Sequence, residues 1–393
     1  MMRQLVQALA LAGLLGAGPG LVQTALADTA AAGPKTPTLS DIFAASGITE
    51  SGYIDIGYSA LNSTGLFVTG GNSRVFDTPK ASAGHDFNSF NLNQAALTLA
   101  KQPASGFGGL VNVTLGQDAT VIQSYGATSA ANFDLTQAYG SYATGPVTVI
   151  AGKFATLAGA ELIASPQDTN YSRSILFGYA IPFTHTGVRV TYAPTSAYSL
   201  IAGVNNGWDQ VSSQQHDKTI ELGFTAAPNK MFSLAGSYYG GKELTTEPAA
   251  PTATSALGMR NLFDVVATLN ATDKLTFIVN GDYGTQDNAS LADANGASTA
   301  KWTGVAGYVN YQLAPTWRLS VRGEYFNDKD GYRTGIAQKW KEGTVTVAYL
   351  PAPSYELRGE IRHDWSNQAA FLRSDGTAGK SQTSLGLEAL YKF

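Results

Sequence analysis

The chain has 393 residues, no cysteine, 14% charged residues, 44% hydrophobic residues and a formal net charge of −4. The lack of cysteine excludes disulfides, thiolate metal sites and thiol catalysis, and the slightly acidic balance argues against a nucleic-acid partner, which needs a basic face. Soluble domains usually carry about 25% charged residues, so this chain is poor in charge. After residue 30 it also lacks a run of ~20 apolar residues, the length that a membrane-spanning helix needs.

The N-terminal residues have the pattern of a secretory signal. Arg3 supplies a positive charge, Leu5–Leu21 form an apolar stretch, and Ala25-Leu26-Ala27 offers a small-x-small cleavage site. A retained membrane anchor fits less well, because the apolar run is short and Pro19 interrupts it. We therefore predict a signal peptide over residues 1–27.

Two further regions follow the signal. Residues 28–48 are predicted to be a periplasmic lead-in with one or two helical turns over 38–46, where Leu39, Ile42 and Phe43 share a face. Residues 49–393 are predicted to form an all-β domain.

The strand pattern is clearest in residues 355–365. Successive side chains of a strand point to opposite faces, and here the sequence separates them by chemistry. The apolar face carries Tyr355, Leu357, Gly359, Ile361 and Trp365, and the charged face carries Glu356, Arg358, Glu360, Arg362 and Asp364. In a soluble sandwich the apolar face would be the core; in a transmembrane barrel it would meet lipid and the charged face would line water.

The spacing of turns and the aromatic residues favour the barrel. Short turns rich in Pro and Gly alternate with long polar loops, as in outer-membrane barrels. The pattern gives a transmembrane antiparallel up-and-down β-barrel of about 16 strands, although fourteen or eighteen also fit, and an even number places both termini in the periplasm. Aromatics near the short turns form one expected belt: Tyr192, Tyr198, Tyr311, Trp317, Tyr349 and Tyr355. Aromatics near the long loops form the other: Tyr238, Phe263, Tyr283, Trp302, Tyr325, Trp340 and Trp365.

A barrel of sixteen strands leaves an aqueous channel, and groups at its narrowest point set selectivity. Loop 157–182 is the predicted constriction, because Leu162, Ile163, Ile175, Leu176 and Phe177 make it too apolar to stand in water. Folding back into the lumen or capping a neighbouring subunit would bury these side chains. The predicted pore-lining charges are Lys153, Glu161, Asp168, Arg173, Arg189, Arg318, Arg322, Glu324, Glu356, Arg358, Glu360 and Arg362. Either the acidic loop faces the basic wall across the opening, or these charges pair with neighbours on adjacent strands.

Several segments resemble the OmpL-like β-barrel porin family. The resemblance is concentrated in residues 74–209 and rests on Arg74–Asp77, Leu92–Leu99, Gly152–Phe154, Gly159–Glu161, Asn170–Ser174, Pro182–Thr184, Gly187–Arg189 and Asn206–Asp209. It implies an outer-membrane channel and identifies no solute. The terminal Phe393 ends an alternating aromatic strand, which resembles the signal by which outer-membrane proteins are recognised for assembly.

The pattern as a whole predicts a passive diffusion channel for small hydrophilic solutes in the outer membrane of a Gram-negative bacterium. Expected partners are membrane lipid and the assembly machinery; porins of this size typically form homotrimers, and no cofactor or metal is implied. One alternative is a plugged barrel that serves a structural or partner-binding role. A second is an outer-membrane hydrolase, for which the pair His363 and Ser366 is the candidate, without a Gly-x-Ser-x-Gly context.

Overall fold

The computed structural model describes residues 38–393, apart from 79–80, 128–130, 246–256, 292 and 294–297. The predicted signal peptide lies outside the described residues, as do residues 28–37 of the lead-in. None of the described helices has the length and apolar character needed to cross a bilayer.

Helix α2 (Leu39–Ala45) confirms the helical turns expected within 38–46. Its start is a reciprocal cap: the Asp41 amide donates to the Thr38 hydroxyl at 3.2 Å, and the Asp41 carboxylate accepts from the Thr38 amide at 2.8 Å.

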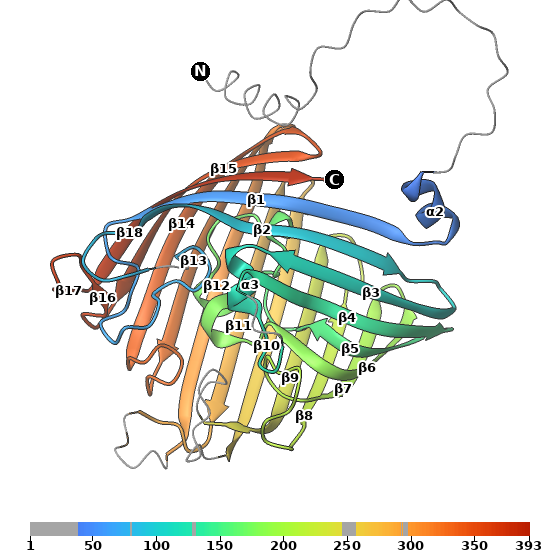
Figure 1. Ribbon diagram of the computed structural model, residues 1–393, viewed down its shortest axis with the longest axis horizontal. Coiled ribbons are helices and arrows are strands. Elements are labelled where there is room, and N and C mark those ends of the chain that lie inside the picture. Colours follow the sequence, from blue (N-terminus) through green and yellow to red (C-terminus); the bar gives the residue numbers. More distant parts are fainter. Residues whose placement is uncertain (1–37, 79–80, 128–130, 246–256, 292, 294–297) are drawn as a thin grey trace, which may run out of the picture. The chain divides into compact units, whose positions relative to one another are not determined.

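Residues Phe43–Phe393 form one compact unit whose sixteen long strands close into an antiparallel barrel (Figure 1). Each strand pairs with its neighbours in the chain, and β1 pairs with β18 to close the sheet. The strands are β1 (Thr49–Leu61), β2 (Asn88–Lys101), β3 (Gly106–Leu115), β4 (Phe133–Thr144), β5 (Val147–Ala155), β6 (Thr184–Thr195), β7 (Tyr198–Asn205), β8 (Thr219–Ala226), β9 (Phe232–Leu244), β10 (Leu257–Thr272), β11 (Leu275–Gln286), β12 (Ala300–Ala314), β13 (Trp317–Asp328), β14 (Gln338–Ala352), β15 (Tyr355–Ser366) and β18 (Ser381–Lys392).

The remaining elements lie in the long loops. Helix α3 (Gln117–Ile122) follows β3, and the helical turns η1 (Ser165–Gln167) and η2 (Leu176–Ala180) lie in loop 157–182. Strands β16 (Phe371–Leu372) and β17 (Ala378–Gly379) form a small separate hairpin in the last loop. The predicted count of sixteen barrel strands is therefore confirmed.

The expected alternation of faces is also confirmed. In β15, Glu356, Arg358, Glu360, Arg362 and Asp364 are buried inside the barrel, whereas Tyr355, Ile361 and Trp365 are exposed on the outer surface. In this strand polar side chains thus face the interior and apolar side chains face the outside, the reverse of a soluble protein and the arrangement that a lipid environment requires.

The belt of aromatics near the long loops is partly wrong. Trp302 and Trp340 are fully buried inside the barrel, not exposed to lipid. Both occupy even, inward positions of their strands, and the Trp302 indole N–H donates to the Ala180 carbonyl at 3.1 Å. The interior contains an apolar cluster where the loop meets the wall, and these rings belong to it. Phe263, Tyr283 and Trp365 do lie exposed on the outer surface.

Glycine is required at one position of β5 that lies against β4. Gly152 pairs with Tyr139 of β4 in the register; it adopts φ +137°, and a Cβ there would lie 2.2 Å from the Ala138 carbonyl oxygen. We expect Gly152→Ala to lower the free energy of unfolding by about 1–3 kcal/mol, through backbone strain and steric overlap. Urea unfolding of the refolded barrel in lipid vesicles measures this change.

Gly140 on β4 is the matched control, since a Cβ there would meet no atom within 4 Å. Gly140→Ala should leave the unfolding midpoint almost unchanged. Equal midpoints for the Gly152 and Gly140 variants would contradict the close-packing argument.

Candidate functional site

Loop 157–182 folds back inside the barrel, as its apolar residues predicted. Ile175, Leu176 and Phe177 are each at most 2% exposed and pack with Trp302 and Trp340. Leu162 differs from the expectation, since it remains 45% exposed. The loop is therefore partly a buried core element and partly a surface of the lumen.

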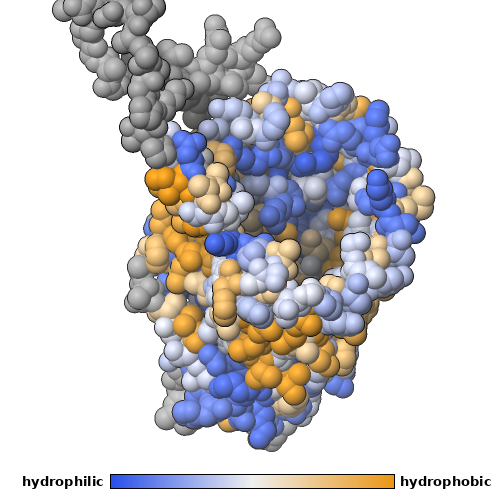
Figure 2. All heavy atoms as spheres, turned by 90° about the vertical axis from the view of Figure 1, so that its right-hand side faces the viewer, coloured by the Kyte–Doolittle hydropathy of each residue, from blue (hydrophilic) through white to orange (hydrophobic). Residues whose placement is uncertain are grey.

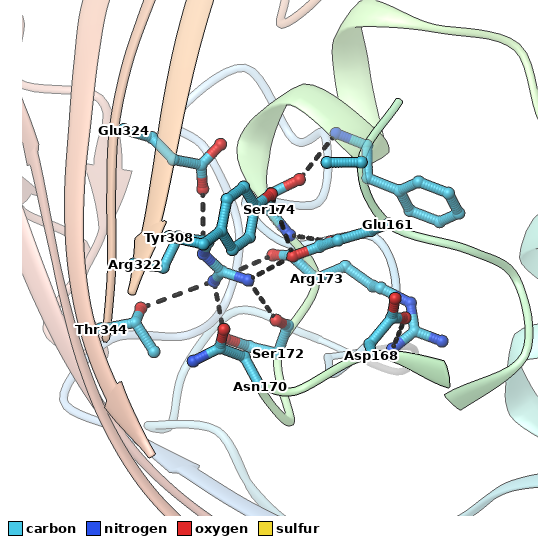
Figure 3. Close-up of polar contacts among 12 residues, drawn as sticks. Glu161, Asp168, Asn170, Ser172, Arg173, Ser174, Tyr308, Arg322, Glu324 and Thr344 are labelled. Carbon is cyan, nitrogen blue, oxygen red and sulfur yellow. Dashed lines mark hydrogen bonds and ion pairs between the residues drawn. The ribbon is translucent and has the colours of Figure 1, made fainter. Parts of the chain in front are cut away.

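The guanidinium of Arg322, on β13, is the centre of the contact between loop and wall (Figure 3). It forms ion pairs with Glu161 of the loop at 2.7 Å and with Glu342 of β14 at 2.9 Å. It also lies 3.3 Å from Glu324 on its own strand and donates to the Ser172 carbonyl oxygen at 2.6 Å. Arg322 is 1% exposed, so these partners replace the water that a buried charge loses.

Two wall carboxylates bind the backbone of the loop directly. Glu324 accepts from the amides of Ile175 and Leu176 at 2.9 and 3.1 Å. Glu360 of β15 accepts from the amides of Tyr171 and Ser172 at 2.7 and 3.0 Å. Each carboxyl group accepts through both of its oxygens, so each pair of hydrogen bonds fixes two consecutive residues of the loop.

The wall arginines complete the attachment by donating to loop carbonyl groups. Arg358 donates to the oxygens of Asp168 and Asn170 at 2.7 and 3.1 Å, and Arg362 donates to that of Arg173 at 2.7 Å. We call the set Arg322, Glu324, Arg358, Glu360 and Arg362 the wall clamp. These residues form hydrogen bonds with backbone N–H and C=O groups of a segment that has no sheet partner of its own.

The loop also carries its own ion pair, between Asp168 and Arg173 at 3.0 Å. The Arg173 guanidinium lies 5.6 Å from the Phe76 ring and 5.7 Å from the Phe177 ring, a distance at which cation–π attraction operates. Loop 62–87, which contains Phe76, is thereby joined to loop 157–182 inside the barrel.

The structure brings most of the predicted pore charges together, in contact and not across a gap. Glu161 and Arg322 touch, so the acidic loop and the basic wall are paired at this point. Two predicted residues lie apart from the clamp: Lys153 pairs with Asp134 at 3.0 Å, and Arg189 pairs with Glu221 at 2.5 Å. Arg318 pairs with Glu356 at 2.5 Å beside the clamp. Whether these charges line a constriction remains a prediction.

Sequence reasoning missed three residues of the clamp region. Glu342 lies at an inward position of β14 beside Arg322, Tyr308 of β12 donates to Glu161 at 3.3 Å, and Glu388 of β18 pairs with Arg358 at 2.9 Å. Strand parity alone would have placed Glu342 and Glu388 inside. The contact of Tyr308 depends on the path of the loop, which has no sequence periodicity.

Helix α3 contributes a buried acid beneath the loop. Gln94 of β2 donates to the Asp118 carboxyl at 2.7 Å and to the Ile163 carbonyl oxygen at 2.8 Å. Burial raises the pKa of Asp118 to about 8, and the charge of Arg173 opposes part of that rise. Among the described residues, no cluster of three or more His, Cys, Asp or Glu side chains suits a metal ion.

Open space remains at both ends of the barrel. Viewed from the side where the β2–β3 and β4–β5 turns lie, the molecule has a deep hollow with a mainly hydrophilic lining (Figure 2). Near the long loops a cavity of about 820 Å³ is lined by residues that include Tyr125, Trp208, Arg260 and Arg333.

A closed barrel of sixteen antiparallel strands with a polar interior and an inward-folded loop is the architecture of the outer-membrane porins. The family described as "Putative beta-barrel porin-2, OmpL-like" matches residues 47–393. The chain therefore belongs to the OmpL-like β-barrel porin family, as the sequence resemblance indicated. Comparison with the sequences of curated proteins gave no match.

Solved porin structures share the fold at low sequence identity. The anion-selective porin from Comamonas acidovorans is 11% identical with a TM-score of 0.59, covering 88% of this chain and 99% of that one. The outer membrane channel DcaP of Acinetobacter baumannii is 15% identical with a TM-score of 0.58, covering 88% and 97%. OmpT, an outer membrane protein of Vibrio cholerae, is 12% identical with a TM-score of 0.57, covering 88% and 97%. These similarities show the fold.

We expect Arg322→Met to loosen the loop, because it leaves Glu161, Glu324 and Glu342 buried without their shared cation. Breaking a buried pair in this way typically costs about 3–5 kcal/mol. Hydrogen exchange of the amides in residues 161–177 should rise strongly. Lys153→Met is the control, since it breaks a buried ion pair away from the loop and should leave those amides protected. Equal protection of the loop in both variants would contradict the clamp.

The raised pKa of Asp118 predicts a pH dependence with a definite sign. An Asp carboxyl titrates near pH 4 when unfolded and at about 8 in the folded protein, so folding favours its neutral form. The stabilisation is fully present below pH 4 and is lost as the pH rises through 8. Hydrogen exchange of α3, corrected for the intrinsic rate, should therefore accelerate between pH 4 and 8 and level off above pH 8.

Asp118→Asn should remove that acceleration, because the amide is neutral at every pH and can still accept from Gln94. Asp86→Asn, at an exposed loop position, should leave the acceleration in place. A profile for Asp118→Asn identical to that of the unmodified protein would rule out Asp118 as its origin.

Proposed function

We propose that this protein is a passive diffusion channel for small hydrophilic solutes in the outer membrane of a Gram-negative bacterium. Membership of a porin family and a closed sixteen-strand barrel support this proposal. So does the interior, where charged residues such as Glu221, Arg322 and Glu360 replace the apolar core of a soluble barrel.

The path of loop 157–182 is the observation that carries the proposal. Its residues contact successive strands along the wall: Leu157 bonds to Tyr239 of β9, Ala160 to Asn280 of β11, and Glu161 to Arg322 of β13. A segment held along the wall by its backbone narrows the lumen and cannot move freely. We infer that loop 157–182 forms the constriction, and that the paired charges around it keep the passage hydrated.

Orientation and assembly belong to the same proposal. With an even number of strands, both termini would lie on the periplasmic side, beside the short turns. Residues 1–27 would direct export, and Phe393 would serve the assembly machinery. Phe393 is 60% exposed, and its backbone exchanges two hydrogen bonds of 2.9 Å with Gly52, so it ends the strand that closes the barrel.

The two alternatives differ in their support. A plugged barrel is favoured by one observation, since helix α3 and loop 62–87 also occupy the interior and pack near loop 157–182. The hydrolase alternative loses its candidate pair. His363 points outward and contacts Thr383 at 2.6 Å, whereas the Ser366 hydroxyl points inward and donates to Gln338 at 2.7 Å.

Single-channel recording in a planar bilayer tests the channel directly. The refolded mature chain should give discrete conductance steps, and a salt gradient should give a reversal potential whose sign reports the selected ion. Replacing residues 161–176 with a Gly-Ser linker of equal length should raise the conductance severalfold, because the linker lacks the groups that bind the wall.

A Gly-Ser replacement of the exposed residues 373–377, in another long loop, is the control and should leave the conductance unchanged. A folded barrel that never conducts, even with the linker in loop 157–182, would contradict the channel and support the plugged alternative. Conductance equal in the native and linker proteins would show that loop 157–182 is not the constriction.

A further inference from the structure

The outer surface of three neighbouring strands carries an isolated group of positive charges. Lys301 of β12, Lys329 just after β13, and Lys339 and Lys341 of β14 are all exposed on the outward side, near the long loops. We call these four residues the lysine row. In the part of the chain that the structure describes, none of their ammonium groups forms an ion pair.

Aromatic residues mark the depth of this surface in the membrane. Tyr325, Lys341 and Trp365 lie side by side in the register of β13, β14 and β15, and the Lys341 ammonium lies 6.0 Å from the centre of the Tyr325 ring. Tyr and Trp favour the boundary between lipid headgroups and acyl chains. The lysine row therefore lies at headgroup level, and the next row of residues toward the short turns lies among the chains.

That next row consists of three glycines in register: Gly307, Gly323 and Gly343. A Cβ at Gly307 would meet no atom within 4 Å, and at Gly323 and Gly343 the nearest atoms would be 3.9 and 3.8 Å away. None of the three adopts a positive φ. Glycine weakens a strand, and here neither backbone conformation nor close packing requires it; such positions mark places where another molecule approaches the backbone.

The glycines form the floor of a groove on the outside of the barrel. The groove has a volume of about 720 Å³, with mainly apolar atoms exposed, and is lined by Val305, Gly307, Gly323, Glu324, Tyr325, Lys341, Glu342 and Trp365. The carboxyl groups of Glu324 and Glu342 are buried inside the barrel, where both contact Arg322. At one end of the groove a lysine ammonium group therefore lies beside aromatic side chains, and the rest of the groove is smooth and apolar. This combination suits a ligand with a negatively charged head and a hydrocarbon tail.

We propose that this groove and the lysine row form a binding site for a membrane lipid with a phosphate-bearing headgroup. One acyl chain lies over the glycine floor between Tyr325 and Trp365, and the phosphate lies among the lysines. β12 to β15 are consecutive neighbours in the sheet (Figure 1), so a single lipid can contact all four strands.

Charge complementarity favours a lipid over a second copy of this chain. Of the acidic residues in the described barrel strands, only Glu50 is exposed; the others are buried inside the barrel. The strand surface of a second copy therefore offers almost no partner for four ammonium groups. A phosphate offers that partner without the need to desolvate a carboxylate.

Native mass spectrometry of the detergent-purified mature chain tests the proposal. The probes are phosphatidylglycerol and phosphatidylcholine with identical acyl chains. We expect tighter binding of phosphatidylglycerol, and the triple variant K301Q/K339Q/K341Q should weaken that binding about a hundredfold, since each lysine near an anionic lipid contributes about fivefold. Binding of phosphatidylcholine should not change. K242Q, at an exposed position on β9, is the control for general loss of charge.

A second variant tests the groove independently of charge. Gly323→Leu fills the floor and should weaken the binding of both lipids, whereas Gly359→Leu, an outer-surface glycine of β15 outside the groove, should not. Neither substitution meets a steric obstacle at its Cβ, and the heat-dependent shift in gel mobility confirms that each variant is folded.

Three results would overturn the proposal. Equal affinity for the two lipids would show that the lysine row does not recognise phosphate. Unchanged phosphatidylglycerol binding in the triple variant would place the site elsewhere. Loss of an oligomer in Gly323→Leu without loss of lipid would show that the groove is a contact between copies of the chain. None of these measurements depends on whether the barrel conducts.

Discussion

The buried guanidinium of Arg322 is the interaction on which the interior of this barrel depends. A charge with 1% exposure is costly unless geometry and hydrogen bonds replace water. Arg322 meets that condition through Glu161, Glu342 and the Ser172 carbonyl, and in doing so it joins the loop to β13 and β14. Arginine suits this role because its planar guanidinium group donates several hydrogen bonds in fixed directions. The ammonium group of a lysine donates in less fixed directions.

The clamp has a consequence for the rest of the interior. Once the backbone of loop 157–182 is bound by Glu324 and Glu360, the apolar side chains of the loop must be buried from water. Trp302 and Trp340 of the barrel wall pack against them. The barrel therefore contains a small hydrophobic core inside a polar lumen, and the two parts depend on each other: polar groups hold the loop backbone, and aromatic rings bury its side chains.

The sequence predicted the sheet and the inward charges but not the contacts of the loop. Strand parity is sufficient to place Glu360 and Arg362 inside, because one face of each strand meets lipid and cannot hold a charge. The same rule places Trp302 inside, whereas its closeness to a long loop favours a membrane belt; the structure follows the parity. The contact of Glu324 with two loop amides has no sequence pattern, since any residue supplies an amide. The sequence predicts Lys153 and Arg189 as pore-lining charges together with the clamp residues, because parity gives the face of a strand and not the position around the barrel.

The distribution of basic residues follows from the two environments. Inside, the clamp arginines lie against fixed carboxylates and carbonyl groups, where a rigid planar donor loses little entropy on binding. On the outer face of the strands near the long loops, the exposed cations are lysines, whose flexible apolar stems can lie along lipid while the ammonium reaches the headgroups. Because nearly all strand carboxylates point inside, the lysines of the lysine row are left with no carboxylate partner on the barrel wall. The polar lumen and the positively charged outer surface thus have one cause: nearly all acidic residues of the strands point into the barrel.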